Sequence, residues 1–176
     1  AKMHIYNRDG SAGGVGGNSI RCVGKYLLEK GIVKDKDVVR IETDHGINEV
    51  RLYSINGKVR SASVNLGEVR LKGAEIPCVW KEEEQIVGKE IEIGGQKYSA
   101  TLVNIGNPHC VVFGGDPYAL ALEKIGPAFE HHEVFPESVN TEFVEVLAKN
   151  ELKMRVWERG NGETWACGTG ACAVAV

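Results

Sequence analysis

The dipeptide Asn56-Gly57 is the feature that most constrains the fold, because it stands between two runs that alternate apolar and polar residues. A type I′ turn needs a positive φ at both central residues, and Asn and Gly adopt that conformation most readily. The flanking runs, residues 47–55 and 58–66, are therefore expected to pair as an antiparallel hairpin. The pair Gly94-Gly95 predicts a second hairpin further along the chain.

Other short strands and a few helices complete the pattern. The remaining expected strands are residues 38–43, 90–93, 96–105, 138–147 and 152–157. The expected helices are residues 19–30, capped by Asn18 or Ser19, and residues 116–131, opened by Pro117. Hairpins without regular strand–helix alternation indicate an α+β fold. We place the domain boundary in the loop at residues 65–68, giving domains of residues 1–66 and 67–176.

Composition excludes several classes of protein. Of the 176 residues, 43% are hydrophobic and 26% charged, which is typical of a folded globular chain. The net charge of −3, without any Lys/Arg-rich run, argues against nucleic acid as a partner. No apolar stretch reaches the ~20 residues of a membrane span. Five Cys without a signal-peptide pattern indicate reduced thiols and a cytoplasmic location.

Both ends of the sequence resemble internal positions. Ala1 is not an initiator Met, and residues 171–176 form an apolar run without a helix-ending Gly. We therefore expect the chain to be an internal portion of a longer protein.

One internal repeat suggests a site. Gly16 follows Asn7 by nine positions and Cys167 follows Glu158 by nine, and in each case a polar, Gly-containing loop leads into an expected helix. The first N–H groups of a helix have no partner within the helix, so they bind anions such as a carboxylate. The same field lowers the pKa of a nearby thiol, which makes Cys167 a candidate base or nucleophile and the most reactive of the five thiols. Cys22, Cys78 and Cys110 lie in apolar runs, which are typical of buried, inert thiols.

A competing pattern covers the same helix start. Residues 168–173 match the G-x-G-x-x-A fingerprint of dinucleotide-binding proteins. The polar loop before it is atypical of that motif, because a long apolar strand should stand there. Residues 107–109 are expected to form a polar turn between apolar runs, either as a plain loop or as a turn that aims His109 into a cleft.

Five segments together resemble diaminopimelate epimerase, in the order of that family and across nearly the whole chain. They are residues 7–11, 17–22, 107–109, 139–141 and 157–171, the last reading Trp-Glu-Arg-Gly-Asn-Gly-Glu-Thr-Trp-Ala-Cys-Gly-Thr-Gly-Ala. The resemblance implies two similar α+β domains, each a curled mixed or antiparallel sheet around a central helix. It also implies a pseudo-twofold axis with the active site in the cleft between the domains.

The implied activity is epimerisation of LL- to meso-diaminopimelate by two thiols, in lysine and peptidoglycan precursor synthesis, without cofactor or metal. By resemblance, Cys167 is one thiol, and His109 and Glu158 tune the thiols. The implied substrate ligands are Asn7, Gly17, Asn18, Asn107, Asn140, Arg159, Gly168 and Thr169. The expected partner is the small-molecule substrate, with a homodimer left open, and neither nucleic acid nor membrane is expected.

The chain departs from the family at one catalytic position. The family has its other catalytic Cys immediately before Gly17, where this sequence has Gly16. Inversion needs an acid and a base on opposite faces of the α-carbon, so the chain as written is expected to be impaired. Two alternatives stay open: a non-catalytic amino-acid-binding relative, and a dinucleotide-binding module built on residues 168–173.

Overall fold

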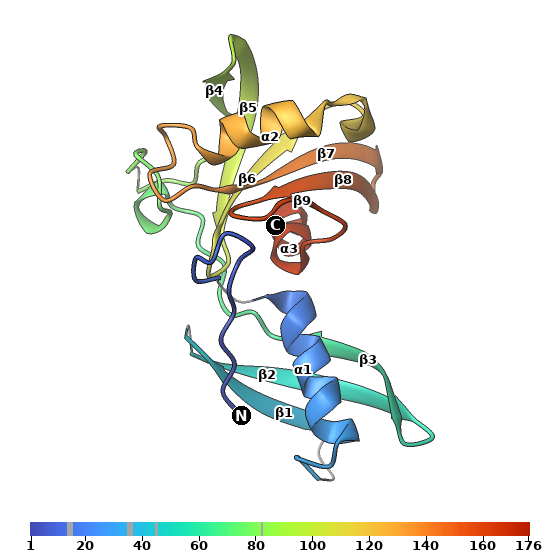
Figure 1. Ribbon diagram of the computed structural model, residues 1–176. Coiled ribbons are helices and arrows are strands. Elements are labelled where there is room, and N and C mark those ends of the chain that lie inside the picture. Colours follow the sequence, from blue (N-terminus) through green and yellow to red (C-terminus); the bar gives the residue numbers. More distant parts are fainter. Residues whose placement is uncertain (14–15, 35–36, 45, 82) are drawn as a thin grey trace. The chain divides into compact units, whose positions relative to one another are not determined.

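The computed structural model describes residues 1–13, 16–34, 37–44, 46–81 and 83–176. The chain divides into two compact units, Ala1–Gly67 and Glu68–Val176 (Figure 1). Among the described residues, the first unit contains a β-sheet with one helix and the second a β-sheet with two α-helices, and the predicted α+β class is confirmed. Within the described ranges, no helix is long and apolar enough to cross a membrane.

The first unit packs one helix on a three-stranded antiparallel sheet. Its elements are α1 (Gly17–Glu29), β1 (Val38–Thr43), β2 (Gly46–Ile55) and β3 (Lys58–Val64), with strand order β1-β2-β3. Asn56 and Gly57 have φ values of 51° and 71°, which confirms the predicted hairpin. The core contains Ile20 and Leu27 from α1 and the buried strand residues Val39, Ile41, Val50, Leu52 and Val59.

Helix α1 begins earlier than predicted. Asn18 and Ser19 lie inside the helix, and Gly16 is the N-cap, with an extended backbone (φ −84°, ψ 101°) and no side chain to cap the first turn. The Gly16 carbonyl accepts from the Ile20 amide at 3.0 Å, so the first turn closes before the expected capping residues. The prediction of a side-chain cap is therefore wrong.

The second unit contains a six-stranded mixed sheet of order β4-β5-β6-β7-β8-β9. Its strands are β4 (Lys89–Ile93), β5 (Gln96–Asn104), β6 (Pro108–Phe113), β7 (Asn140–Ala148), β8 (Glu151–Glu158) and β9 (Gly162–Thr164). Among these six described strands, β6 and β7 pair in parallel and the other neighbours pair antiparallel. The β4–β5 turn has positive φ at Gly94 and Gly95, as predicted.

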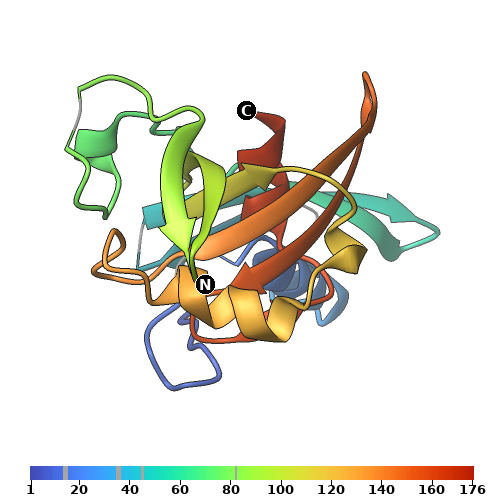
Figure 2. The same ribbon diagram turned by 90° about the horizontal axis from the view of Figure 1, so that it is seen from above.

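Two helices cover opposite faces of this sheet, and strand β7 lies between them (Figures 1 and 2). Phe143 of β7 meets Phe129 of α2 (Leu122–Glu130) edge to face, with ring centroids 5.3 Å apart. Its neighbour Glu142 points the other way, toward Gly170 of α3 (Gly168–Ala175). Because both faces are covered, a polar side chain on the α3 face of β7 is shielded from water.

The helix predicted over residues 116–131 is interrupted. A 3₁₀ turn, η2 (Pro117–Ala119), comes first, with the Asp116 carboxylate accepting from the Tyr118 amide at 3.0 Å. Leu120 is extended (ψ 137°), so α2 starts only at Leu122. Strand β6 begins at Pro108, so the expectation that His109 lies in a polar turn is wrong: His109 pairs within the sheet and is buried. The short β9 and the 3₁₀ turn η1 (Gly73–Glu75) are further elements that the sequence pattern did not predict.

Candidate functional site

Cys167 occupies the N-cap of α3, with an extended backbone (φ −119°, ψ 115°). Its sulfur accepts a hydrogen bond from the Gly170 amide at 3.3 Å and lies 3.3 Å from the Thr169 hydroxyl oxygen. The residue is only 9% exposed. A sulfur that receives donors at a helix N-terminus is in a position that favours a thiolate.

Burial opposes this stabilisation of the thiolate. Burial, followed by the Glu158 charge, raises the pKa of the Cys167 thiol to about 11, although the bonds from Thr169 and Gly170 act in the opposite direction. The expected lowering of this pKa is therefore wrong for the chain as it stands. Desolvation of the charged form exceeds the effect of two hydrogen bonds, because the sulfur has almost no contact with water.

A continuous chain of polar contacts leads away from Cys167. Asn107 Nδ2 donates to Thr169 Oγ1 at 3.2 Å, and Asn107 Oδ1 lies 3.0 Å from His109 Nε2. The other ring nitrogen, Nδ1, lies 2.8 Å from Glu142 Oε1. His109 and Glu142 have no exposed side-chain surface. The structure thus connects Cys167, Thr169, Asn107 and His109, all four expected from the sequence, to a fifth residue that was not expected.

That fifth residue, Glu142, lies inside strand β7 and faces α3. A Cβ placed on Gly170 would overlap Glu142 Oε1, so the absence of a side chain at Gly170 is what lets the carboxylate approach the helix. The sequence signal for Glu142 is a charged residue within a mostly apolar strand. That signal is readable only when β7 is known to be covered on both faces.

Asn140 and Arg159 contact each other next to the series of polar contacts that joins Cys167 to Glu142. Asn140 is buried; its Oδ1 accepts from the Arg159 amide at 2.9 Å, and its Nδ2 donates to the Pro108 carbonyl at 2.9 Å. The Arg159 guanidinium donates to the Glu137 carbonyl at 3.0 Å. Asn140 therefore fixes the start of the loop that carries Arg159. Glu158, the preceding residue, accepts a hydrogen bond from the Thr164 hydroxyl across that loop.

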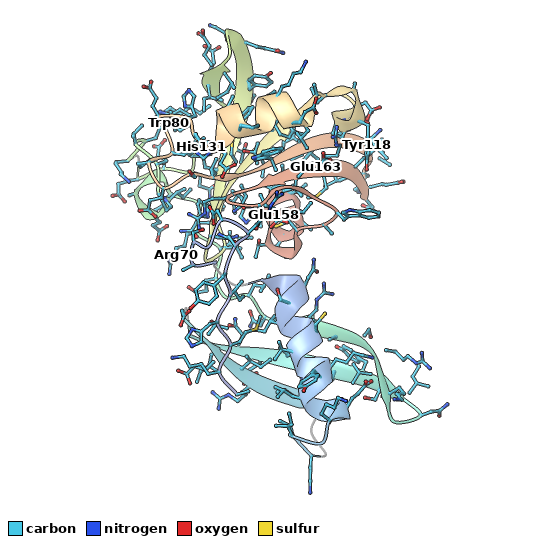
Figure 3. All side chains as sticks on the ribbon, viewed as in Figure 1. Arg70, Trp80, Tyr118, His131, Glu158 and Glu163 are labelled. Carbon is cyan, nitrogen blue, oxygen red and sulfur yellow. The ribbon has the colours of Figure 1, made fainter. Side chains whose placement is uncertain are left out.

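A cavity of about 470 Å³ is lined in part by Cys167, and its lining also includes Tyr118, Arg155, Glu163 and Trp165. Arg155 makes a two-pronged ion pair with Glu163, at 2.8 and 3.0 Å, and its guanidinium also lies over the Tyr118 ring (Figure 3 labels Tyr118 and Glu163). The lining of this cavity does not include the expected substrate ligands of the second unit.

Gly168 is the first residue of α3 in the second unit, and the other expected residues lie in the first unit. Asn7 closes a tight loop in which its Nδ2 donates to Ser11 Oγ at 3.0 Å. Gly17 is buried in the first turn of α1, and Asn18 is exposed and accepts from Arg21. Residues 14 and 15 of the intervening loop lie outside the described residues.

The internal repeat has a local structural basis. Gly16 is the N-cap of α1 as Cys167 is the N-cap of α3, and both have an extended backbone. A tight antiparallel loop precedes each of them, closed by the Tyr6–Ala12 bridge in one unit and by the Glu158–Gly162 pair in the other. Position 16 is thus the local counterpart of Cys167.

The dinucleotide fingerprint does not have its required context. The strand before α3 is the three-residue β9, which pairs antiparallel with β8, whereas a dinucleotide site needs a parallel β-α-β unit. The second glycine of the pattern, Gly170, is explained by the contact with Glu142. In the described part of the chain, no three His, Cys, Asp or Glu side chains are grouped closely enough to hold a metal ion.

The comparison with known sequences confirms the resemblance found in the motifs. A family model described as diaminopimelate epimerase matches residues 101–176. Curated relatives named diaminopimelate epimerase are 47% identical over 180 residues in Desulfovibrio desulfuricans and 48% identical over 175 residues in Acetivibrio thermocellus. Each alignment covers 99% of this chain and 62% of the relative. The chain therefore spans less than two thirds of the length of these relatives.

Solved structures support the fold. A probable proline racemase from Agrobacterium radiobacter K84 matches with a TM-score of 0.72 at 19% identity, over 97% of this chain and 53% of the other. A hydroxyproline epimerase from Agrobacterium vitis matches with a TM-score of 0.71 at 16% identity, over 99% of this chain and 54% of the other. At such identities the likeness concerns the fold alone.

Proposed function

We propose that this chain, which is similar to diaminopimelate epimerases along nearly its whole length, is the larger part of an enzyme that epimerises LL-diaminopimelate to meso-diaminopimelate. The observation that carries the proposal is Cys167 at the N-cap of α3, where the Gly170 amide and the Thr169 hydroxyl both reach its sulfur. Such a sulfur can accept the α-proton of an amino acid without a cofactor.

The reaction needs a thiolate on one face of the substrate α-carbon and a thiol on the other face. The first removes the α-proton, and the second returns a proton with inversion. The α-carboxylate becomes more electron-rich as the proton leaves, and unpaired helix N–H groups stabilise that charge. In this proposal Cys167 is one of the two bases, and Gly168 and Thr169 help to bind the carboxylate. Gly17 and Asn18 do the same at the start of α1.

The distal end of the substrate is assigned to polar side chains. We propose that Asn7, Asn107, Asn140 and Arg159 bind this end, and that His109 and Glu158 tune the thiol. A guanidinium suits a carboxylate, because its paired donors match the two oxygens. The contact between Asn140 and the Arg159 amide supports this assignment, since it fixes the loop from which Arg159 extends.

The partner proposed is the small molecule alone, in the cytoplasm. The five cysteines, all among the described residues, form no disulfide bond with one another, which is compatible with a reducing compartment. A homodimer stays an open alternative that solution mass measurement would decide.

Gly16 supplies no proton, so the chain as written should not invert the substrate efficiently. Cys167 alone can exchange the α-proton of one stereoisomer with solvent. Restoring a thiol by Gly16→Cys, in a protein of the length of the curated relatives, should raise the inversion rate about 10²–10⁴-fold. The φ of Gly16 suits any L-residue, and the atom nearest to a new Cβ is Ser19 Oγ at 2.5 Å, the end of a side chain that can rotate away.

Circular dichroism and deuterium incorporation from heavy water measure inversion and exchange separately. Gly16→Ser is the matched control, because it has similar size but a hydroxyl that ionises far less readily than a thiol. Adding Cys167→Ala to the Gly16→Cys protein should abolish inversion. If the Gly16→Cys protein binds diaminopimelate yet neither inverts it nor exchanges its α-proton, the non-catalytic binding alternative replaces this proposal.

A further inference from the structure

We infer that Glu142 is a positioning residue for Cys167: it fixes the direction of the hydrogen bonds that run through His109, Asn107 and Thr169 to the sulfur. This inference rests on the proposed function only for its catalytic meaning. The contacts themselves lie within the second unit, and each is a separate observation.

The direction follows from donor and acceptor counting. Asn107 Nδ2 donates to Thr169 Oγ1, so the side of Asn107 that faces His109 is the acceptor Oδ1. His109 Nε2 must therefore carry a proton. The Thr169 oxygen accepts from Asn107, so its hydroxyl proton is left to donate, and among the described residues Cys167 Sγ lies within reach of it at 3.3 Å. The sulfur is thus the accepting end of the chain, which favours the thiolate.

Glu142 makes this direction difficult to reverse. One proton lies between Nδ1 of His109 and Oε1 of Glu142, whether it is bonded to nitrogen or to oxygen, and in both forms Nε2 keeps its own proton and the pair is neutral. To reverse these hydrogen bonds, Nε2 must lose its proton. If the proton leaves the pair, a net negative charge remains on two side chains with no exposed surface. If it moves to Glu142 Oε2, the pair stays neutral, but the new hydroxyl has no acceptor, because Oε2 is buried and has no hydrogen-bond partner within the described part of the protein.

A Glu142→Gln substitution removes this restriction without changing the charge of the pair. A Gln amide can donate to Nδ1 or accept from it, so either neutral form of His109 fits. When the hydrogen bonds run in the opposite direction, the Cys167 thiol can donate to Thr169, which stabilises the thiol by about one neutral hydrogen bond. The asparagine amide in the middle of the chain is a poor carrier of protons, so Glu142 acts by orientation and not by proton transfer.

The test is the alkylation rate of Cys167 in the full chain at a fixed pH, followed by mass spectrometry of the Cys167 site. Glu142→Gln should lower the rate about two- to tenfold. Glu145→Gln is the matched control: it is the same change on the same strand, at a side chain that pairs with Lys153, and it should leave the rate unchanged.

A double-mutant cycle separates orientation from a general structural effect. Thr169→Val removes the hydroxyl at nearly constant volume and interrupts the series of hydrogen bonds between His109 and Cys167. Glu142→Gln should therefore have no further effect on the alkylation rate in that background. If Glu142→Gln lowers the alkylation rate equally with Thr or Val at position 169, the inference is overturned.

Nitrogen NMR of the histidine ring gives a second test that needs no variant to fold. In the unaltered chain, His109 Nε2 should be protonated, and a proton should be shared at Nδ1. An unprotonated Nε2 overturns the inference. The alkylation rate of Cys167 and the NMR signal of His109 are both measured without substrate. A failure of the proposed epimerase activity would therefore leave both measurements unchanged and can be told apart from a failure of this inference.

Discussion

Gly170 has no side chain, and Oε1 of Glu142 occupies the space that a Cβ would take. The substitution Gly170→Ala should therefore displace the carboxylate or the start of α3. Overpacking of this kind costs about 1–3 kcal/mol, more than the roughly 0.5–1 kcal/mol by which Ala stabilises a helix relative to Gly. We expect net destabilisation of the second unit, measured by urea unfolding.

Tryptophan fluorescence reports on this unit alone, because Trp80, Trp157 and Trp165 all belong to it. Gly115→Ala is the control, since a Cβ at Gly115 would meet nothing within 4 Å. Its free energy of unfolding should change by less than about 0.5 kcal/mol. Equal stability of the two variants would show that the contact between Glu142 and Gly170 does not constrain the helix.

For single residues, the sequence predicted the positions that belong to a repeated pattern and missed the position whose role depends on a tertiary contact. The nine-position repeat found Gly16 and Cys167, and both are N-caps. It did not find Glu142, because the role of that side chain depends on the parallel pairing of β6 with β7, which no local pattern encodes. The predicted low pKa of Cys167 failed for a similar reason, since helix position is readable in sequence and depth of burial is not.

At the scale of elements, Arg155 joins three parts of the second unit. Its guanidinium bonds both Glu163 oxygens in β9 and donates at 2.9 Å to the carbonyls of Pro117 and Leu120, at η2 and just after it. A Lys cannot make these bonds together, because its ammonium is a single point of charge. Arg155→Lys should therefore lower the free energy of unfolding by about 1.5–3 kcal/mol.

This loss should depend on pH. The Arg155 guanidinium holds the pKa of the Glu163 carboxyl below its usual range. A carboxyl with a lowered folded pKa contributes its full stability above the ordinary value of about 4.3, and loses it as pH falls through the lowered value. The difference between Arg and Lys at position 155 should thus be largest near neutral pH and shrink in acid. The exposed Arg70 provides the control: Arg70→Lys should change stability by less than about 0.5 kcal/mol at any of these pH values.

Elements were predictable to the extent that their ends carry local signals. Both hairpins were located from glycine-containing turns, and β1 was predicted with its observed bounds. The helix expected over residues 116–131 failed at its first part, because the bond from Asp116 to the Tyr118 amide favours a 3₁₀ turn that Leu120 then ends. Strand β9 was missed because it has only three residues and forms by pairing with β8.

At the scale of the whole molecule, the five thiols are distributed over both units and differ widely in their exposure to solvent. Cys22 on α1 and Cys172 on α3 are exposed, and Cys78, Cys110 and Cys167 are buried. The expectation that Cys22 would be buried is wrong: its neighbours Ile20 and Gly24 face the sheet and Cys22 lies on the other side of the helix. The expectation that Cys78 and Cys110 are buried is confirmed.

These differences predict an order of alkylation in the native chain near neutral pH. This order replaces the expectation from the sequence that Cys167 is the most reactive thiol. Cys22 and Cys172 should react first, because a reagent reaches them without any opening of the structure. Cys167 should follow, since its sulfur is nearly covered and burial raises its pKa to about 11. Its rate should rise about tenfold for each pH unit below that value, because the thiolate is the reacting form. Cys78 and Cys110 should react only on unfolding, and burial also raises the pKa of Cys110 far above its ordinary value.

Mass spectrometry after brief exposure to iodoacetamide at several pH values measures all five sites in one sample, and the urea-unfolded protein calibrates their full reactivity. Labelling of Cys167 ahead of Cys22 at pH 7 would mean that its thiolate has stabilising contacts beyond Thr169 and Gly170, and the burial argument for its high pKa would then be wrong.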